Sequence, residues 1–147
     1  MTDESTEIDD IDLRIIGSLA QDGRMSWKDL GDRVHLAASS VGERVRRLER
    51  AGVLTGYRAE VDPAALGRGL RAVLDLRLAP EAVPERFESL LAGRAEVVTA
   101  AAVTGSAGYT LVVDCAGTAG LDALLRWCRA HGAEVVESRV VLRRVVG

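Results

Sequence analysis

The spacing of the apolar residues changes once along the chain, in the stretch around Gly67 and Gly69, and this change limits the fold most strongly. Before it, apolar residues recur at the spacing of amphipathic helices. After it, Leu70–Leu78 alternates apolar with mixed residues, which is the period of a β-strand. A chain of 147 residues, 48% of them hydrophobic, has room for two small domains with buried cores. We therefore predict a helical domain followed by a domain built on a sheet.

The first third of the chain is predicted to form three short helices. The first ends near Asp22-Gly23, and Ser26–Asp29 has the pattern of a capping box that starts the second. A break over residues 35–37 precedes the third helix, and Gly52 is placed to be its left-handed C-terminal cap. The residues predicted to face inward are Ile8, Ile11, Ile15 and Leu19, then Trp27, Leu30 and Val34, and finally Val41, Val45 and Leu48.

The rest of the chain alternates strands and helices. The order is strand, helix, strand, strand, helix, strand, which is the split ferredoxin-like arrangement. The fold class is therefore predicted as α+β, with a helix-turn-helix followed by a ferredoxin-like βαββαβ domain. The predicted strands are Leu70–Leu78, Val97–Val103, Tyr109–Cys115 and Val135–Val146; one helix runs from Pro84 to Gly93 and the other from Leu121 to Gly132.

Four segments follow from these patterns. Residues 1–7 are predicted to form an acidic tail, and residues 8–62 the helical domain. That domain ends in a linking strand over Val53–Val61, which Pro63 stops. Residues 63–69 are a linker, and residues 70–147 form the sheet domain.

The third predicted helix concentrates positive charge in a chain whose formal net charge is −3. If its apolar residues face inward, Ser39, Glu43, Arg46, Arg47 and Arg50 cover the opposite side, with Ser40 and Arg44 on the flank. Two helices joined by a tight break are typical of a helix-turn-helix. The second helix of such a pair enters the major groove, where its first residues meet base edges and its later cations meet phosphates. The alternative is a solvated helix face on which Glu43 pairs with Arg47.

The chain resembles the Lrp/AsnC family, the feast/famine transcriptional regulators, from Ile8 to Val146. The residues that carry the resemblance are Asp9-x-x-Asp12-x-x-Ile15-Ile16, Asp22-Gly23-Arg24-Met25-Ser26 with Leu30 and Val34, Val45-x-x-Leu48-Glu49-x-x-Gly52-Val53-Leu54, Gly56-Tyr57, Val61-Asp62-Pro63 and Leu66-Gly67. The resemblance implies a winged helix-turn-helix and a C-terminal RAM-type domain that senses an amino acid or related small metabolite. It also implies homodimers, and often octamers, that bind double-stranded promoter DNA.

The sequence departs from the family pattern in both domains. Ala37 and Ala38 stand where the family often has serine and proline, and Gly42 weakens the third helix by roughly 1 kcal/mol relative to alanine. The family's effector loop carries two acidic residues, whereas this chain has none there. Without a carboxylate, the strong charged contact to an amino acid's ammonium group is missing. The ligand-binding residues that the resemblance implies are Thr104, Gly105, Ser106, Ala107 and Gly108 in the loop and Ser138 in the last strand. In the same strand, Val136 stands where the family has another residue of the site. The alternative is a hairpin turn without a ligand.

The predicted strand Val97–Val103 is small and mostly apolar on both faces. Because helices cover only one face of a ferredoxin-like sheet, we expect a second subunit to cover the other. The strand over Val53–Val61 is a further candidate for pairing between subunits.

Other classes of protein find little support in the sequence. No apolar run approaches the roughly 18 residues of a membrane span, so we expect a soluble, cytoplasmic protein without a membrane partner. Cys115 and Cys128 lack metal-ligand spacing, and His35 and His131 have no neighbouring nucleophile, so no metal, cofactor or enzymatic activity is predicted. Two alternatives stay open: a sirohaem-decarboxylase-like enzyme, because a few relatives of the family act on such tetrapyrroles, and an oligomeric ligand module that does not bind DNA.

Overall fold

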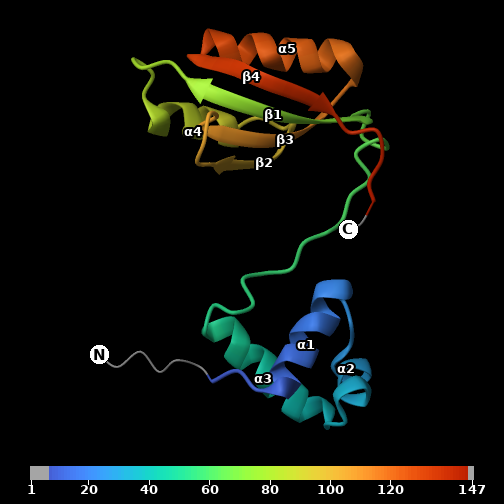
Figure 1. Cartoon of the computed structure of the whole chain (residues 1–147). Coiled ribbons are helices and arrows are strands. Elements are labelled where there is room, and N and C mark those ends of the chain that lie inside the picture. Colours follow the sequence, from blue (N-terminus) through green and yellow to red (C-terminus); the bar gives the residue numbers. More distant parts are fainter. Residues whose placement is uncertain (1–6, 146–147) are drawn as a thin grey trace, which may run out of the picture. The chain divides into compact units, whose positions relative to one another are not determined.

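The computed structural model describes residues 7–145, and its contacts divide the chain between residues 60 and 61 into two compact units (Figure 1). Of the predicted acidic tail, residues 1–6 lie outside the described residues. Within the described part, no helix is both long enough and apolar enough to cross a membrane.

The N-terminal unit contains the three predicted helices. They are α1 (Asp10–Gln21), α2 (Trp27–Val34) and α3 (Ala38–Arg50). Asp9 caps α1 and Ser26 caps α2, each accepting a hydrogen bond from a backbone N–H three residues later. The core buries Ile15, Leu19, Leu30, Val34, Val41, Val45 and Leu48, whereas Ile8 and Trp27, which we predicted to face inward, are 41% and 40% exposed.

The turn between α2 and α3 depends on two residues with unusual backbone requirements. His35 ends α2 in the left-handed conformation, with φ of 58°. A Cβ atom on Gly31 would lie 2.5 Å from the carbonyl oxygen of Leu36, a distance that real Cβ atoms do not show. Gly31 therefore lets the chain pass close over α2 as it enters α3.

Residues 53–61 do not form the predicted strand. Gly52 has the expected positive φ of 70°, but the chain then continues without regular structure, and residues 7–69 contain no strand. A strand needs a neighbour to take up its backbone hydrogen bonds, and the described part of this unit offers only helices. The linking strand, and the wing that the resemblance implied, are therefore absent from this part of the single chain.

The C-terminal unit is a four-stranded antiparallel sheet with two helices. Its elements are β1 (Leu70–Leu78), α4 (Pro84–Ala92), β2 (Val97–Ala102), β3 (Tyr109–Cys115), α5 (Gly117–Ala130) and β4 (Ala133–Val140). The strand order is β2-β3-β1-β4, with every neighbouring pair antiparallel. This is the predicted ferredoxin-like arrangement, and the α+β fold class is confirmed.

The last strand is displaced from its prediction. β4 begins at Ala133 and ends at Val140, although we predicted Val135–Val146, whose last residue lies outside the described range. Val140 pairs with Ala72, and the backbone N–H of Val141 donates to Arg71. β1 begins at Leu70, only one residue before Arg71, so the residues after Val141 have no strand to pair with.

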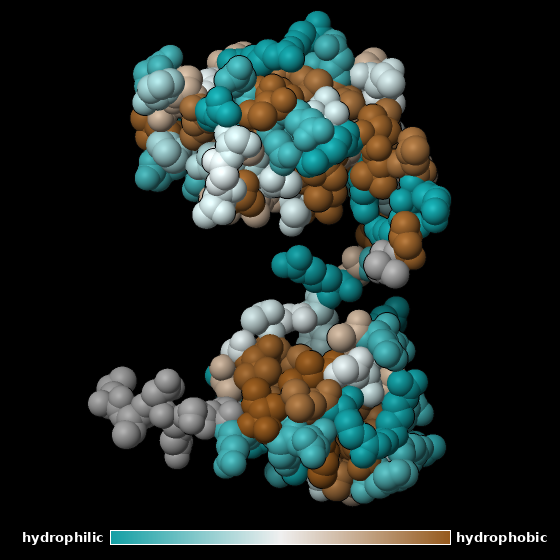
Figure 2. Space-filling model, in the orientation of Figure 1, coloured by the Kyte–Doolittle hydropathy of each residue, from teal (hydrophilic) through white to brown (hydrophobic). Residues whose placement is uncertain are grey.

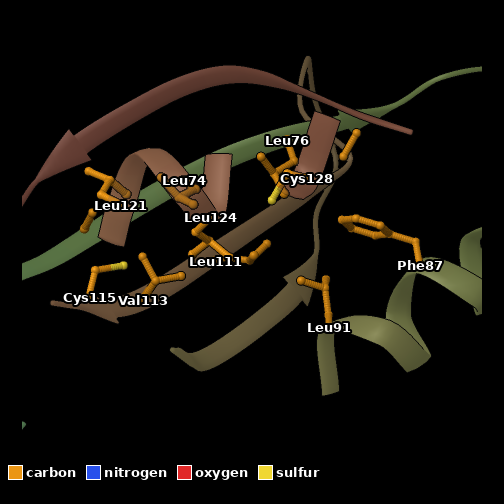
Figure 3. Close-up of a cluster of buried hydrophobic side chains, with 12 residues drawn as sticks. Leu74, Leu76, Phe87, Leu91, Leu111, Val113, Cys115, Leu121, Leu124 and Cys128 are labelled. Carbon is orange, nitrogen blue, oxygen red and sulfur yellow. The ribbon is translucent and has the colours of Figure 1, made fainter. Parts of the chain in front are cut away.

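Both helices cover the same face of the sheet. Figure 3 shows Phe87 and Leu91 of α4 and Leu124 and Cys128 of α5 directed toward residues of β1 and β3 such as Leu74. Both cysteines are free and buried, and burial raises the pKa of the Cys128 thiol to about 11. They belong to the core, as predicted.

The opposite face of the sheet mixes apolar side chains with charges that pair with one another. Val73 and Val112 lie side by side in the register of β1 and β3. Arg71 donates two hydrogen bonds to Asp114, at 2.6 and 2.7 Å. Asp75 accepts from Thr110 and from an arginine of β4 at 2.6 Å each. A partner covering this face would therefore meet charges that are already compensated.

Candidate nucleic-acid interface

All seven residues predicted to contact DNA lie on α3, and the three apolar residues predicted to face inward are fully buried. This division follows from the helical period, which puts Val41, Val45 and Leu48 on one side of the helix. Together with Asp9, six of the seven line one polar surface depression: Ser40, Glu43, Arg44, Arg46, Arg47 and Arg50. Ser39 is exposed in the first turn of α3.

Two of the four arginines form ion pairs with the start of α1. Arg44 donates to Asp9 at 2.7 Å and to Asp12 at 2.9 Å. Arg47 donates to the other oxygen of Asp12 at 2.5 Å. The Asp12 side chain is completely buried, whereas the side chains of Arg44 and Arg47 are 28% and 40% exposed. We call these four residues the Asp–Arg network.

The Asp–Arg network is also part of the N-terminal cap of α1. The side chains of Asp9 and Asp12 each accept from the other's backbone N–H, at 2.8 and 3.1 Å. The backbone bond from Asp12 and the bond from Arg44 lower the pKa of the Asp9 carboxyl, and the same ion pair raises the pKa of Arg44. A buried carboxylate that loses its partners costs about 3–5 kcal/mol, so Asp12 holds both arginines against α1.

Arg46 and Arg50 differ from this pair. Both are exposed, and within residues 7–145 neither forms an ion pair. The predicted alternative, a pair between Glu43 and Arg47, is not formed in this part of the chain either, because Arg47 turns toward Asp12. Arg46 lies near Trp27: a Cβ built on Gly42 would be 3.9 Å from the Arg46 guanidinium and 3.8 Å from the indole. Both are ordinary van der Waals distances, so the indole of α2 lies against α3 beside Gly42 without requiring a glycine there.

Sequence reasoning did not assign a role to Asp9, Asp12 or Gly31. A signal for Asp12 was present, since it falls on the same helical stripe as Ile15 and Leu19, where a carboxylate needs a cationic partner. The identity of that partner was not readable, because Arg44 and Arg47 lie 32 and 35 residues further along the chain.

The predicted ligand loop lies between β2 and β3 and is held by backbone contacts. The guanidinium of Arg77 donates twice to the carbonyl oxygen of Ser106, at 2.9 and 2.7 Å. The backbone N–H of Gly108 donates to Leu76 of β1. Ser138 lies in β4, and β1 separates β4 from β3, so Ser138 is two strand spacings, roughly 10 Å, from the strand that follows the loop. A single chain therefore does not bring Ser138 and the loop together.

Two family models match the chain. One, for the AsnC-type helix-turn-helix domain, matches residues 8–49; the other, for the Lrp/AsnC ligand binding domain, matches residues 71–147, more than half of the chain. The chain belongs to the Lrp/AsnC family. The resemblance carried by its sequence motifs is confirmed.

Relatives and solved structures agree with this assignment. This Lrp/AsnC protein is 34% identical to the HTH-type transcriptional regulator LrpA of Mycobacterium tuberculosis, over 92% of this chain and 90% of that relative. The structure of LrpC from Bacillus subtilis matches with a TM-score of 0.88 at 28% identity, covering 95% of this chain and 98% of that one. A feast or famine regulatory protein from M. tuberculosis, complexed with L-methionine, matches with a TM-score of 0.87 at 32% identity and 96% coverage of both chains. These relatives favour a transcriptional regulator over the sirohaem-decarboxylase alternative.

Proposed function

We propose that this Lrp/AsnC regulator binds double-stranded promoter DNA by placing α3 in the major groove. The observation that carries the proposal is the exposed polar face of α3, where four arginines and Glu43 line one depression next to buried apolar residues. Ser39, Ser40 and Glu43 lie toward the N-terminal half of the helix, where a recognition helix meets base edges. These three residues therefore select the site.

The arginines contribute to different degrees. Arg46 and Arg50 are exposed cations on the later turns, and they contact phosphates. Arg44 and Arg47 stay on the proposed interface because part of each side chain is exposed, but their ion pairs reduce the charge that they offer to DNA. Acidic residues elsewhere, which give the chain its net charge of −3, oppose binding to other polyanions.

The test is DNA binding by Arg46→Ala over a range of salt concentrations, using fragments selected by the protein from its source genome. Loss of one phosphate contact reduces the slope of log K against log salt by about 0.9, and affinity at 0.1 M salt falls up to about eightfold. Arg86→Ala is the matched control, because it removes an exposed arginine from α4 in the other unit. An Arg46→Ala protein with unchanged affinity and slope would contradict the proposal.

The site-selecting residues need a different measurement. Ser40→Ala is expected to change which fragments are preferred while leaving the salt slope intact, because base contacts do not release counterions in the way phosphate contacts do. Failure of the wild-type protein to bind any duplex at low salt would instead support an oligomeric ligand module without DNA binding.

The C-terminal unit is proposed to join subunits and to bind a small effector. A regulator from Neisseria meningitidis in complex with L-methionine, 26% identical with a TM-score of 0.86, supports an amino-acid effector for this fold. In this chain the loop 104–108 offers backbone groups and the Ser106 hydroxyl, but no carboxylate for an ammonium group. A second subunit is needed to add further groups, because Ser138 lies two strands away from this loop.

We infer a homodimer as the smallest stable assembly, with an octamer as the larger form. Figure 2 shows apolar residues at the surface of the C-terminal unit, and Val98, Val140 and Leu142 are 53%, 49% and 94% exposed. Light scattering at micromolar protein is expected to give at least the mass of a dimer, and a monomer would refute the inference.

A further inference from the structure

The Asp–Arg network controls how much charge the interface presents. α3 carries four arginines and two glutamates, and Asp9 and Asp12 bring the formal charge of this group to zero. Of these four arginines, only Arg46 and Arg50 form no ion pair with a carboxylate within residues 7–145. An interface that looks strongly basic in sequence is therefore close to neutral in the folded protein.

We propose that Asp9 and Asp12 are specificity-determining residues that withhold Arg44 and Arg47 from DNA phosphates and so suppress non-specific binding. The proposal rests on the proposed function, since it concerns the same surface of α3. Non-specific binding depends on the number of phosphates that cations neutralise, whereas base readout does not. Withdrawing two cations therefore removes a larger share of the free energy of binding to unrelated DNA than to the correct site, where base contacts add to the phosphate contacts.

The two aspartates have different roles in the network. Asp12 is buried and binds both arginines, so it sets the position of α3 against α1. Asp9 is 47% exposed and, of the two arginines, binds only Arg44, so its charge sets how much of the Arg44 charge is compensated. If Asp9 loses its charge, one carboxylate faces two guanidinium groups, and about one positive charge is released at the partly exposed Arg44.

Asp9→Asn isolates this effect, because asparagine caps a helix about as well as aspartate and the variant keeps the N-terminal cap of α1. Asp10→Asn is the matched control. It makes the same change in net charge one residue away, and Asp10 is exposed and makes no ion pair within the described part of the chain. Thermal unfolding of both variants checks that the helical unit stays folded.

The measurement is binding of wild type and both variants to two duplexes, one selected by the wild-type protein and one of unrelated sequence, across salt concentrations. For Asp9→Asn we expect the slope on the unrelated duplex to steepen by up to about 0.9 and affinity at 0.1 M salt to rise up to about eightfold. Affinity for the selected duplex is expected to rise less, so the ratio of the two affinities falls. Asp10→Asn is expected to keep the wild-type slope and ratio.

Two results would overturn this inference and they differ in meaning. If the wild-type protein binds its selected duplex but Asp9→Asn and Asp10→Asn behave alike, the network does not set specificity, and the proposed function stands. If the wild-type protein binds neither duplex, the proposed function fails, and the inference fails with it.

Discussion

Replacing Gly31 by alanine tests whether the turn between α2 and α3 passes as close to Gly31 as the structure shows. The new Cβ would lie 2.5 Å from the Leu36 carbonyl oxygen, about 0.9 Å short of ordinary contact at 3.4 Å. That oxygen belongs to the backbone, and the Gly31 carbonyl accepts the Leu36 N–H in the same turn, so the atoms cannot separate without loss of this bond. Overpacking of this kind costs about 1–3 kcal/mol, and the clash with backbone places it toward the upper end.

Helix propensity acts in the opposite direction. Alanine is about 1 kcal/mol better than glycine inside a helix, so the net loss of stability for Gly31→Ala is expected at about 1–2 kcal/mol. Gly17→Ala is the matched control: Gly17 lies in the exposed middle of α1, and a Cβ there would meet nothing within 4 Å. The same substitution is therefore expected to stabilise the protein at Gly17 by about 0.5–1 kcal/mol.

Urea unfolding followed by far-ultraviolet circular dichroism separates the two variants by the sign of the change. We also expect Gly31→Ala to weaken DNA binding, because moving Leu36 shifts the start of α3 relative to α2. Equal or greater stability of Gly31→Ala compared with wild type would refute the close approach of the turn.

His35→Gly is expected to raise the free energy of unfolding, because an L-residue in the left-handed conformation costs roughly 1–2 kcal/mol and the greater freedom of glycine in the unfolded chain offsets only part of that gain. Urea unfolding checks this, and a loss of stability would show that the imidazole contributes to the fold. Free amino acids are expected to bind weakly, and the Gly108→Asp protein is expected to bind them about tenfold to a hundredfold more tightly. The loop can accept this side chain, because Gly108 has no positive φ and a Cβ there meets only Leu76 at 3.9 Å. Calorimetry on both proteins tests this, and low-micromolar binding by the unmodified chain would contradict the role of the loop. The hydrogen bond to Glu88 raises the pKa of Tyr109 from 10 to about 12. The stability that this phenol adds is therefore complete below pH 10 and is lost as pH rises toward 12. A pH titration of tyrosine absorbance in the Tyr57→Phe protein is expected to show this pKa, and adding Glu88→Gln is expected to bring it back toward 10.

Local pattern was enough to predict most of the elements. The apolar residues at 41, 45 and 48 bury the face of α3 that the helical period assigns to them, and the alternation over Leu70–Leu78 coincides with β1. Gly52 has its predicted positive φ, and Pro84 starts α4. These outcomes depend on contacts within a few residues, so periodicity and turn chemistry contain the information.

Tertiary structure decided the features that depend on distant partners. Residues 53–61 have strand-like composition but no strand beside them in this chain, and β4 ends where β1 runs out. The four arginines of α3 look alike in sequence, yet packing of α1 against α3 buries Asp12 and engages Arg44 and Arg47, while Arg46 and Arg50 stay exposed. Helical spacing determines on which side of a helix a charge lies. Only the position of the neighbouring helix determines whether that charge has an oppositely charged partner within reach.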